Sequence, residues 1–191
     1  MVRSLSWFAI SGAEPGALLD ELQLARTGAM ASHPGQGIFA ASLPDGAFLL
    51  YVDDVRSRLT APSSLKALSH KGRLVACRAD KQVMSSTVSC YHEGELAWSV
   101  AHHARESLFH LAVVGEAPAQ LAALRESAMA AQESEDCCDA DTDYLFDVPI
   151  RLAEALTSFH HVTGLRAPWA DAFEQLQTLQ PPPGKPWWKL W

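Results

Sequence analysis

Four apolar segments in the middle of the chain constrain the fold most. They cover residues 74–79, 82–91, 95–103 and 108–114, and only a few polar or turn-forming residues separate each from the next. In the third segment, Leu96, Trp98, Val100 and His102 recur at every second position, which gives a strand one apolar face. The segments predict a four-strand meander with Trp98 in its core.

The flanking sequence predicts further strands and several helices. Residues 4–9 alternate as in a strand, and residues 38–43 and 47–53 form a hairpin around Pro44, Asp45 and Gly46. Apolar residues at helical spacing predict helices over 15–25, 62–69, 118–132, 148–160 and 168–179. We therefore expect an α+β fold, with a mostly antiparallel sheet of about six or seven strands and helices packed on it.

The chain divides into one domain and a tail. With 191 residues, of which 48% are hydrophobic, it is long enough for one core, and we assign residues 1–180 to a single α+β domain. Residues 181–191 form a C-terminal tail rich in proline and tryptophan. Residues 29–36 are predicted to be a loop. The acidic segment 133–143 is predicted to be mobile, and Asp147 is predicted to cap the helix that follows it.

The composition limits which cellular compartment and which classes of binding partner we expect. The sequence has no run of about twenty apolar residues and no export signal, so we expect a cytoplasmic protein that does not enter a membrane. The four cysteines, two of them adjacent, form no disulfide framework. The net charge of -7 argues against nucleic acid and is compatible with a basic protein partner such as a toxin.

Histidines are the first candidates for chemistry. His102 and His103 end the third strand of the meander, and His110 lies on the fourth. Adjacent residues of a strand point to opposite faces, so His102 and His103 are predicted to be structural or surface residues that do not share a site. His160 and His161 are predicted to end a helix, where cations interact favourably with the last carbonyl groups.

Catalytic and metal-binding motifs do not occur in the sequence. It has no phosphate-binding loop, dinucleotide fingerprint, nucleophile elbow or zinc-ligand spacing. We therefore assign no catalytic residue, no cofactor and no metal site, and a non-catalytic protein-binding domain is the preferred function. The alternative is a small enzyme or ligand-binding domain with a cleft near His102, His110 and Asp53.

Candidate partner-binding residues lie in two places. Large aromatic side chains anchor many interfaces, and carboxylates attract a basic partner. Docking of the tail on its own domain is an equally open alternative. The candidates are Trp187, Trp188 and Trp191 in the tail, and Glu135, Asp136 and Asp139 in the acidic segment.

Two stretches resemble a group of small bacterial proteins of unknown function. They are residues 83–86 with 98–102, and residues 143–149 running into Leu152 and Leu156. Some members of that group resemble immunity proteins of toxin systems. The resemblance implies an immunity-type inhibitor, which blocks a toxin by surface complementarity, and it implies no catalytic residues.

Overall fold

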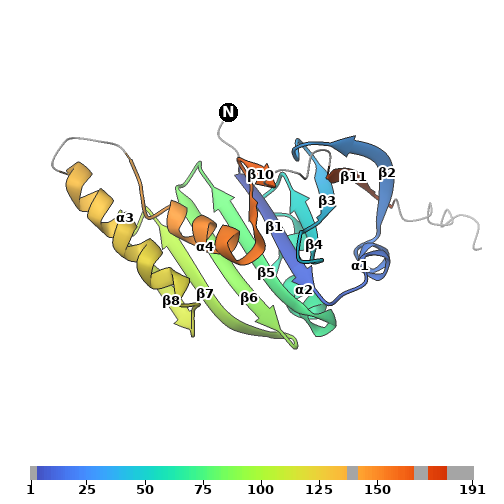
Figure 1. Cartoon of the computed structure of the whole chain (residues 1–191), viewed down its shortest axis with the longest axis horizontal. Helices are drawn as coiled ribbons and strands as arrows, with labels where there is room; N and C mark the ends of the chain where they lie inside the picture. The colour runs from blue at the N-terminus through green and yellow to red at the C-terminus, as the bar shows by residue number, and fades with distance from the viewer. Residues whose placement is uncertain (1–3, 137–141, 166–171, 180–191) are drawn as a thin grey trace, which may run out of the picture.

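A large antiparallel sheet forms the centre of the molecule. The computed structural model describes residues 4–136, 142–165 and 172–179. Within them, nine strands pair in the order β2-β11-β3-β4-β1-β5-β6-β7-β8 (Figure 1). The strands of this sheet are β1 (Ser4–Ser11), β2 (Leu24–Ala31), β3 (Ile38–Ser42), β4 (Phe48–Val52), β5 (Arg73–Asp80), β6 (Ser85–His92), β7 (Glu95–His103), β8 (Ala112–Gly115) and β11 (Phe173–Thr178). A separate hairpin pairs β9 (Phe159–His160) with β10 (Gly164–Leu165).

Helices cover both faces of the sheet. They are α1 (Pro15–Leu22), α2 (Pro62–Leu68), α3 (Gln120–Asp136) and α4 (Asp147–Thr157), with short 3-10 helices at Arg58–Thr60 and Ser69–Lys71. Leu152 and Ile150 of α4 join a core on one face with Trp7 and Trp98, while Leu18 of α1 and Leu65 of α2 join a second core on the other. Figure 1 shows α4 lying across the first face.

The expected α+β class with a mostly antiparallel sheet is confirmed. The four central segments form consecutive neighbours β5 to β8, and Trp98 is only 4% exposed. Their bounds differ from the prediction. β6 begins at Ser85 because Met84, with φ of 46°, ends a turn, and β8 begins at Ala112 because residues 104–111 make a longer connection.

The sheet has nine strands within the described residues, where about six or seven were expected, and two of them occur where the sequence predicted other structure. β2 replaces the end of the predicted first helix and part of the loop 29–36, and β11 replaces the predicted helix 168–179 over Phe173–Thr178. Phe173 belongs to the first core and Leu176 to the second, on opposite faces of the sheet. Their spacing of three therefore reflects a strand buried on both faces, although it is also typical of one face of a helix.

The region around α4 corrects three further predictions. The segment 133–143 is not a loop throughout, because α3 continues through Asp136 and Asp143 is held by side-chain contacts. Asp147 lies in the first turn of α4 and does not cap it. The helix ends at Thr157, because Ser158 adopts φ of 59°, so His160 and His161 do not end a helix.

Within the described residues, no helix is long and apolar enough to cross a membrane.

Candidate functional site

Two serine–histidine pairs lie back to back at the end of β6 and β7. Ser86 pairs across the strands with His102, and Ser85 pairs with His103. Because side chains alternate along a strand, the first pair points to the face that α4 covers and the second to the opposite face. The prediction that His102 and His103 do not share a site is therefore confirmed.

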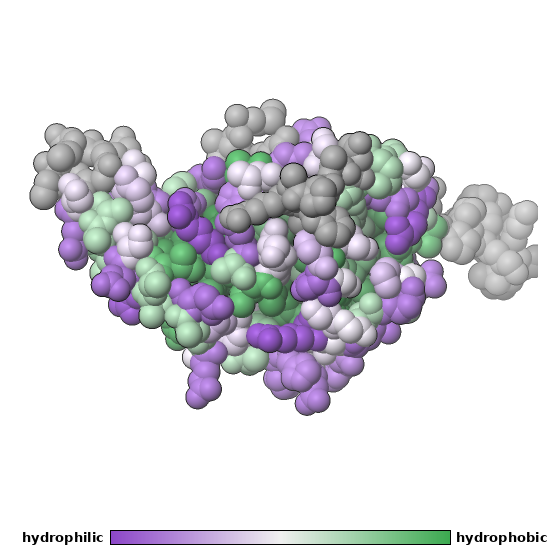
Figure 2. Space-filling view, in the orientation of Figure 1, coloured by the Kyte–Doolittle hydropathy of each residue, from purple (hydrophilic) through white to green (hydrophobic). Residues whose placement is uncertain are grey.

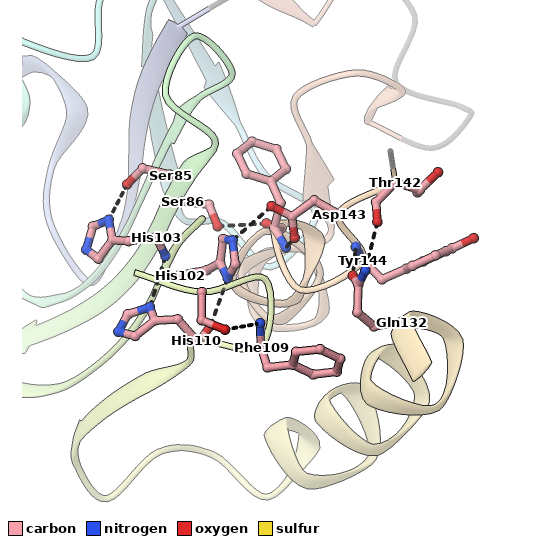
Figure 3. Close-up of polar contacts among 12 residues, drawn as sticks. Ser85, Ser86, His102, His103, Phe109, His110, Gln132, Thr142, Asp143 and Tyr144 are labelled. Carbon is pink, nitrogen blue, oxygen red and sulfur yellow. Dashed lines mark hydrogen bonds and ion pairs between the residues drawn. The ribbon is translucent and has the colours of Figure 1, made fainter. Parts of the chain in front are cut away.

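His102 is fully buried and hydrogen-bonded at both ring nitrogens (Figure 3). Its Nδ1 lies 2.8 Å from the carbonyl oxygen of His110, and its Nε2 lies 3.0 Å from Oδ2 of Asp143. A carbonyl oxygen can only accept, so Nδ1 carries a proton. The contact with Asp143 then holds a second proton between Nε2 and the carboxylate, so the buried pair has no net charge in either arrangement of that proton.

The side chain of Asp143 joins β7 to the start of α4 through hydrogen bonds. Its Oδ1 accepts a hydrogen bond from the backbone N–H of Phe146 at 3.0 Å, and Ser86 Oγ donates to the carbonyl oxygen of Phe146 at 2.7 Å. On the other side of this segment, Gln132 of α3 is fully buried. Its side chain donates to the carbonyl oxygen of Thr142 at 3.1 Å and accepts from the N–H of Tyr144 at 2.9 Å. These contacts fasten α3 and α4 to the end of the sheet (Figure 3).

His110 belongs to the connection between β7 and β8 and contacts both neighbouring histidines. Its Nδ1 accepts a hydrogen bond from the backbone N–H of His103 at 3.0 Å, and its Nε2 lies 3.1 Å from Oε2 of Glu106. Because Nδ1 accepts, the ring proton lies on Nε2, toward the carboxylate. On the same face, Ser85 Oγ lies 2.7 Å from Nδ1 of His103. Internal contacts thus occupy both nitrogens of His102 and of His110.

The structure separates Asp53 from the two histidines of the cleft that the sequence suggested. His102 and His110 lie together, with ring centroids 6.2 Å apart, but Asp53 follows β4, and three strands separate β4 from β7. At about 4.8 Å per strand, that separation is about 19 Å. Three cavities between described residues have volumes of about 210, 180 and 390 Å³, and His102, His110 and Asp53 line none of these three.

A second buried histidine, His161, lies after β9. Its Nδ1 has no hydrogen-bond partner among the described residues, and the residue is 8% exposed. Its ring stacks on that of His160 at 5.0 Å. Burial, with the nearby charges of His160, Lys81 and His33, lowers the pKa of His161 from 6.5 to about 4. His161 is therefore neutral at physiological pH.

The two cysteines of the described residues are buried and belong to no group that could hold a metal ion. Cys77 and Cys90 are buried and free, and burial raises the pKa of the Cys77 thiol to about 12, which leaves it protonated and unreactive. No group of three or more histidine, cysteine or acidic side chains within the described ranges could hold a metal ion.

The structure describes no side chain of the predicted partner-binding residues. Glu135 and Asp136 are in the last turn of α3, where only the backbone is described. Trp187, Trp188, Trp191 and Asp139 fall outside the described residues, so these predictions stay open.

Exposed apolar side chains gather at the β8 end of the sheet, a feature that the sequence reasoning missed. Eight large apolar side chains are exposed in the described part of the chain, and four of them lie between residues 108 and 114. Their exposed fractions are 41% for Leu108, 37% for Phe109, 43% for Val113 and 57% for Val114. The signal was the run 108–115, which contains no Asp, Glu, Lys or Arg and, apart from His110, consists of apolar residues and glycine without alternation.

The helices beside this end pack loosely. Leu124, Ala128 and Ala131 of α3 face Val148 of α4 across the cavity of about 210 Å³. Figure 2 shows hydrophobic surface in the gap between the two helices.

Comparison of the chain with protein-family models, with curated proteins and with solved structures finds no match.

Proposed function

We propose that this chain is a non-catalytic protein-binding domain that docks its partner at the β8 end of the sheet. The observation that carries the proposal is the group of exposed apolar side chains at Leu108, Phe109, Val113 and Val114, beside an edge strand. Several exposed apolar side chains gathered at one end of a sheet are typical of interaction sites in folded proteins. The internal hydrogen bonds of His102 and His110 favour a structural role for the nearest candidates for catalysis.

An immunity-type inhibitor is the specific form of this function that we propose. Blocking a toxin requires complementary surface and no reacting group. The net charge of -7 favours encounter with a basic toxin, because opposite fields accelerate association.

A photo-crosslinking amino acid placed at residue 114 tests the binding surface in cells that express the chain. Met30 on β2 is the matched control, since it also lies on an edge strand and is 56% exposed, against 57% for Val114. We expect a covalent protein adduct from position 114, lost when Val113→Lys is added, and no such adduct from position 30. Absence of an adduct at 114, or equal adducts at both positions, would contradict the proposal.

A further inference from the structure

We propose that β8 pairs antiparallel with β8 of a second copy of this chain, about a two-fold axis through Val113. The two sheets would then continue into one another at this edge. The inference rests on the proposed function, because it names the occupant of the same surface.

The free side of β8 is the first observation. β8 is the last strand of the sheet, hydrogen-bonded to β7 on one side, and on its other side no strand lies within the described part of the chain. Outward-facing N–H and C=O groups of an edge strand bond either to water or to another strand. Gly115 closes the strand with φ of 73°, and a Cβ there would lie 2.2 Å from the carbonyl oxygen of Ala97. The end of β8 is therefore held against β7, with its other side open.

Symmetry limits the register of such a pair. Identical strands joined antiparallel share a two-fold axis perpendicular to the sheet, which leaves each face on its own side. Val113 pairs with Val100, so both side chains point to the face that α4 covers. Centring the axis on Val113 sets this residue opposite its own copy and Ala112 opposite Val114. A shift of the axis to Val114 would instead bring Glu116 opposite Ala112, so the register at Val113 keeps the pairing segment uncharged.

Charge favours a second copy over a basic partner at this position. Residues 108–115 contain no aspartate, glutamate, lysine or arginine, although the chain carries a net charge of -7. Two copies of this segment can approach without like charges facing one another. The carboxylates that would attract a basic toxin lie outside this segment, so the uncharged β8 edge is left for a second copy.

Helix α3, at the same end of the molecule, leaves apolar side chains partly exposed. Of the side chains described in this helix, Gln132 is the one that is buried, while Leu121, Leu124 and Met129 are half-buried. Helices of soluble domains normally bury an apolar stripe. Figure 1 shows α3 at the β8 end and extending beyond the sheet. A second copy joined through β8 would bring its own α3 to this interface and provide the missing cover.

Disulfide trapping tests both the pairing and its register. Val113→Cys is made with Cys137→Ser and Cys138→Ser, while Cys77 and Cys90 stay, because both are buried. Residues directly opposite in an antiparallel pair have Cα atoms about 4.5–5.5 Å apart, which suits a disulfide. We expect Val113→Cys to give a covalent dimer under mild oxidation. Val114→Cys, which would face Ala112, is the matched control and should give at least about tenfold less.

The outcomes separate this inference from the proposed function. A dimer trapped at 113 and not at 114 supports the pairing. Failure at 113, or trapping only at 114, overturns it, provided that circular dichroism shows the native sheet for both variants. If 113 fails while photo-crosslinking at 114 captures a different protein, self-pairing is wrong and the proposed binding function stands. If neither gives an adduct, both are wrong.

Discussion

The two edge strands of the sheet differ in their protection against pairing with another chain. β2 carries Arg26, whose ion pair with Glu174 lies on the surface, and its pairing with β11 shifts register between Glu174 and Leu176. Charges and irregular backbone are the devices by which natural sheets prevent edge-to-edge pairing. β8 has neither a charge nor a register shift in its pairing with β7, and its valines are exposed. The difference is what we expect if β8 pairs with a partner and β2 does not.

The contacts that hold the two edges to the rest of the fold differ as well. Near β8, buried polar contacts of His102, Asp143 and Gln132 join helices to strands. Near β2, apolar burial of Leu24, Phe173 and Leu176 combines with cross-strand contacts at the surface.

The stability of the fold at the β8 end should depend strongly on Asp143. Asp143→Ala leaves His102 buried with an unpaired ring nitrogen and leaves the N–H of Phe146 without its acceptor. Breaking a buried pair in this way costs about 3–5 kcal/mol of the free energy of unfolding, which denaturant titration measures. Asp147→Ala, four residues on and exposed, should cost less than about 1 kcal/mol. Equal losses for the two variants would show that the buried contact does not support this end.

The buried His161, whose Nδ1 has no hydrogen-bond partner among the described residues, should lower the stability of the fold in acid. His161 lies close to His33, which follows β2, and its pKa is lowered from 6.5 to about 4. The unfolded chain therefore binds the proton more readily, so this histidine removes stability as the pH falls from 6.5 to 4 and has no effect above that range. The full loss is about 3 kcal/mol.

The variant His161→Gln isolates this effect. Its free energy of unfolding, measured across pH 4 to 8 and compared with that of the unmodified chain, should show a difference that changes between pH 6.5 and 4 and is constant above pH 7. A difference that is independent of pH would mean that His161 is not buried as described.

The surface ion pair of β2 should contribute least to stability. Glu174→Gln removes the charge that faces Arg26, whose side chain is 51% exposed, but retains an oxygen that can accept from the N–H of Gly28. Exposed ion pairs contribute about 0–1 kcal/mol, so we expect a change within that range in thermal or denaturant unfolding. A loss above about 2 kcal/mol would show that this charge supports the edge and does more than deter pairing.

The sequence predicted the local parts of this fold better than the distant ones. The segments β5 to β8 follow from alternation and short connections, and α2 follows from Pro62 and the spacing of Leu65 and Leu68. β11 was predicted as a helix because its neighbours β2 and β3 lie more than 130 residues earlier in the chain. Propensity within a short window does not report such pairing, and tertiary contacts decide the structure.

The candidate site shows the same limit. Period-two alternation was enough to place His102 and His103 on opposite faces. The contact of His102 with Asp143, 41 residues later, had no signal at His102. A local signal did exist at Asp143, since an aspartate directly before an apolar run is typical of a helix start, but the surrounding acidic residues favoured a loop.

Sedimentation equilibrium of the unmodified chain and of two edge variants tests whether β8 pairs with β8 of a second copy. Val113→Lys places a charge on the β8 edge, and Met30→Lys places one on the β2 edge at a site of similar exposure. We expect a dimer for the unmodified chain and for Met30→Lys, and a dissociation constant raised by about 100-fold for Val113→Lys, because a buried lysine without a partner opposes pairing. A monomer for the unmodified chain, or a dimer that Val113→Lys leaves intact, would contradict the proposed pairing.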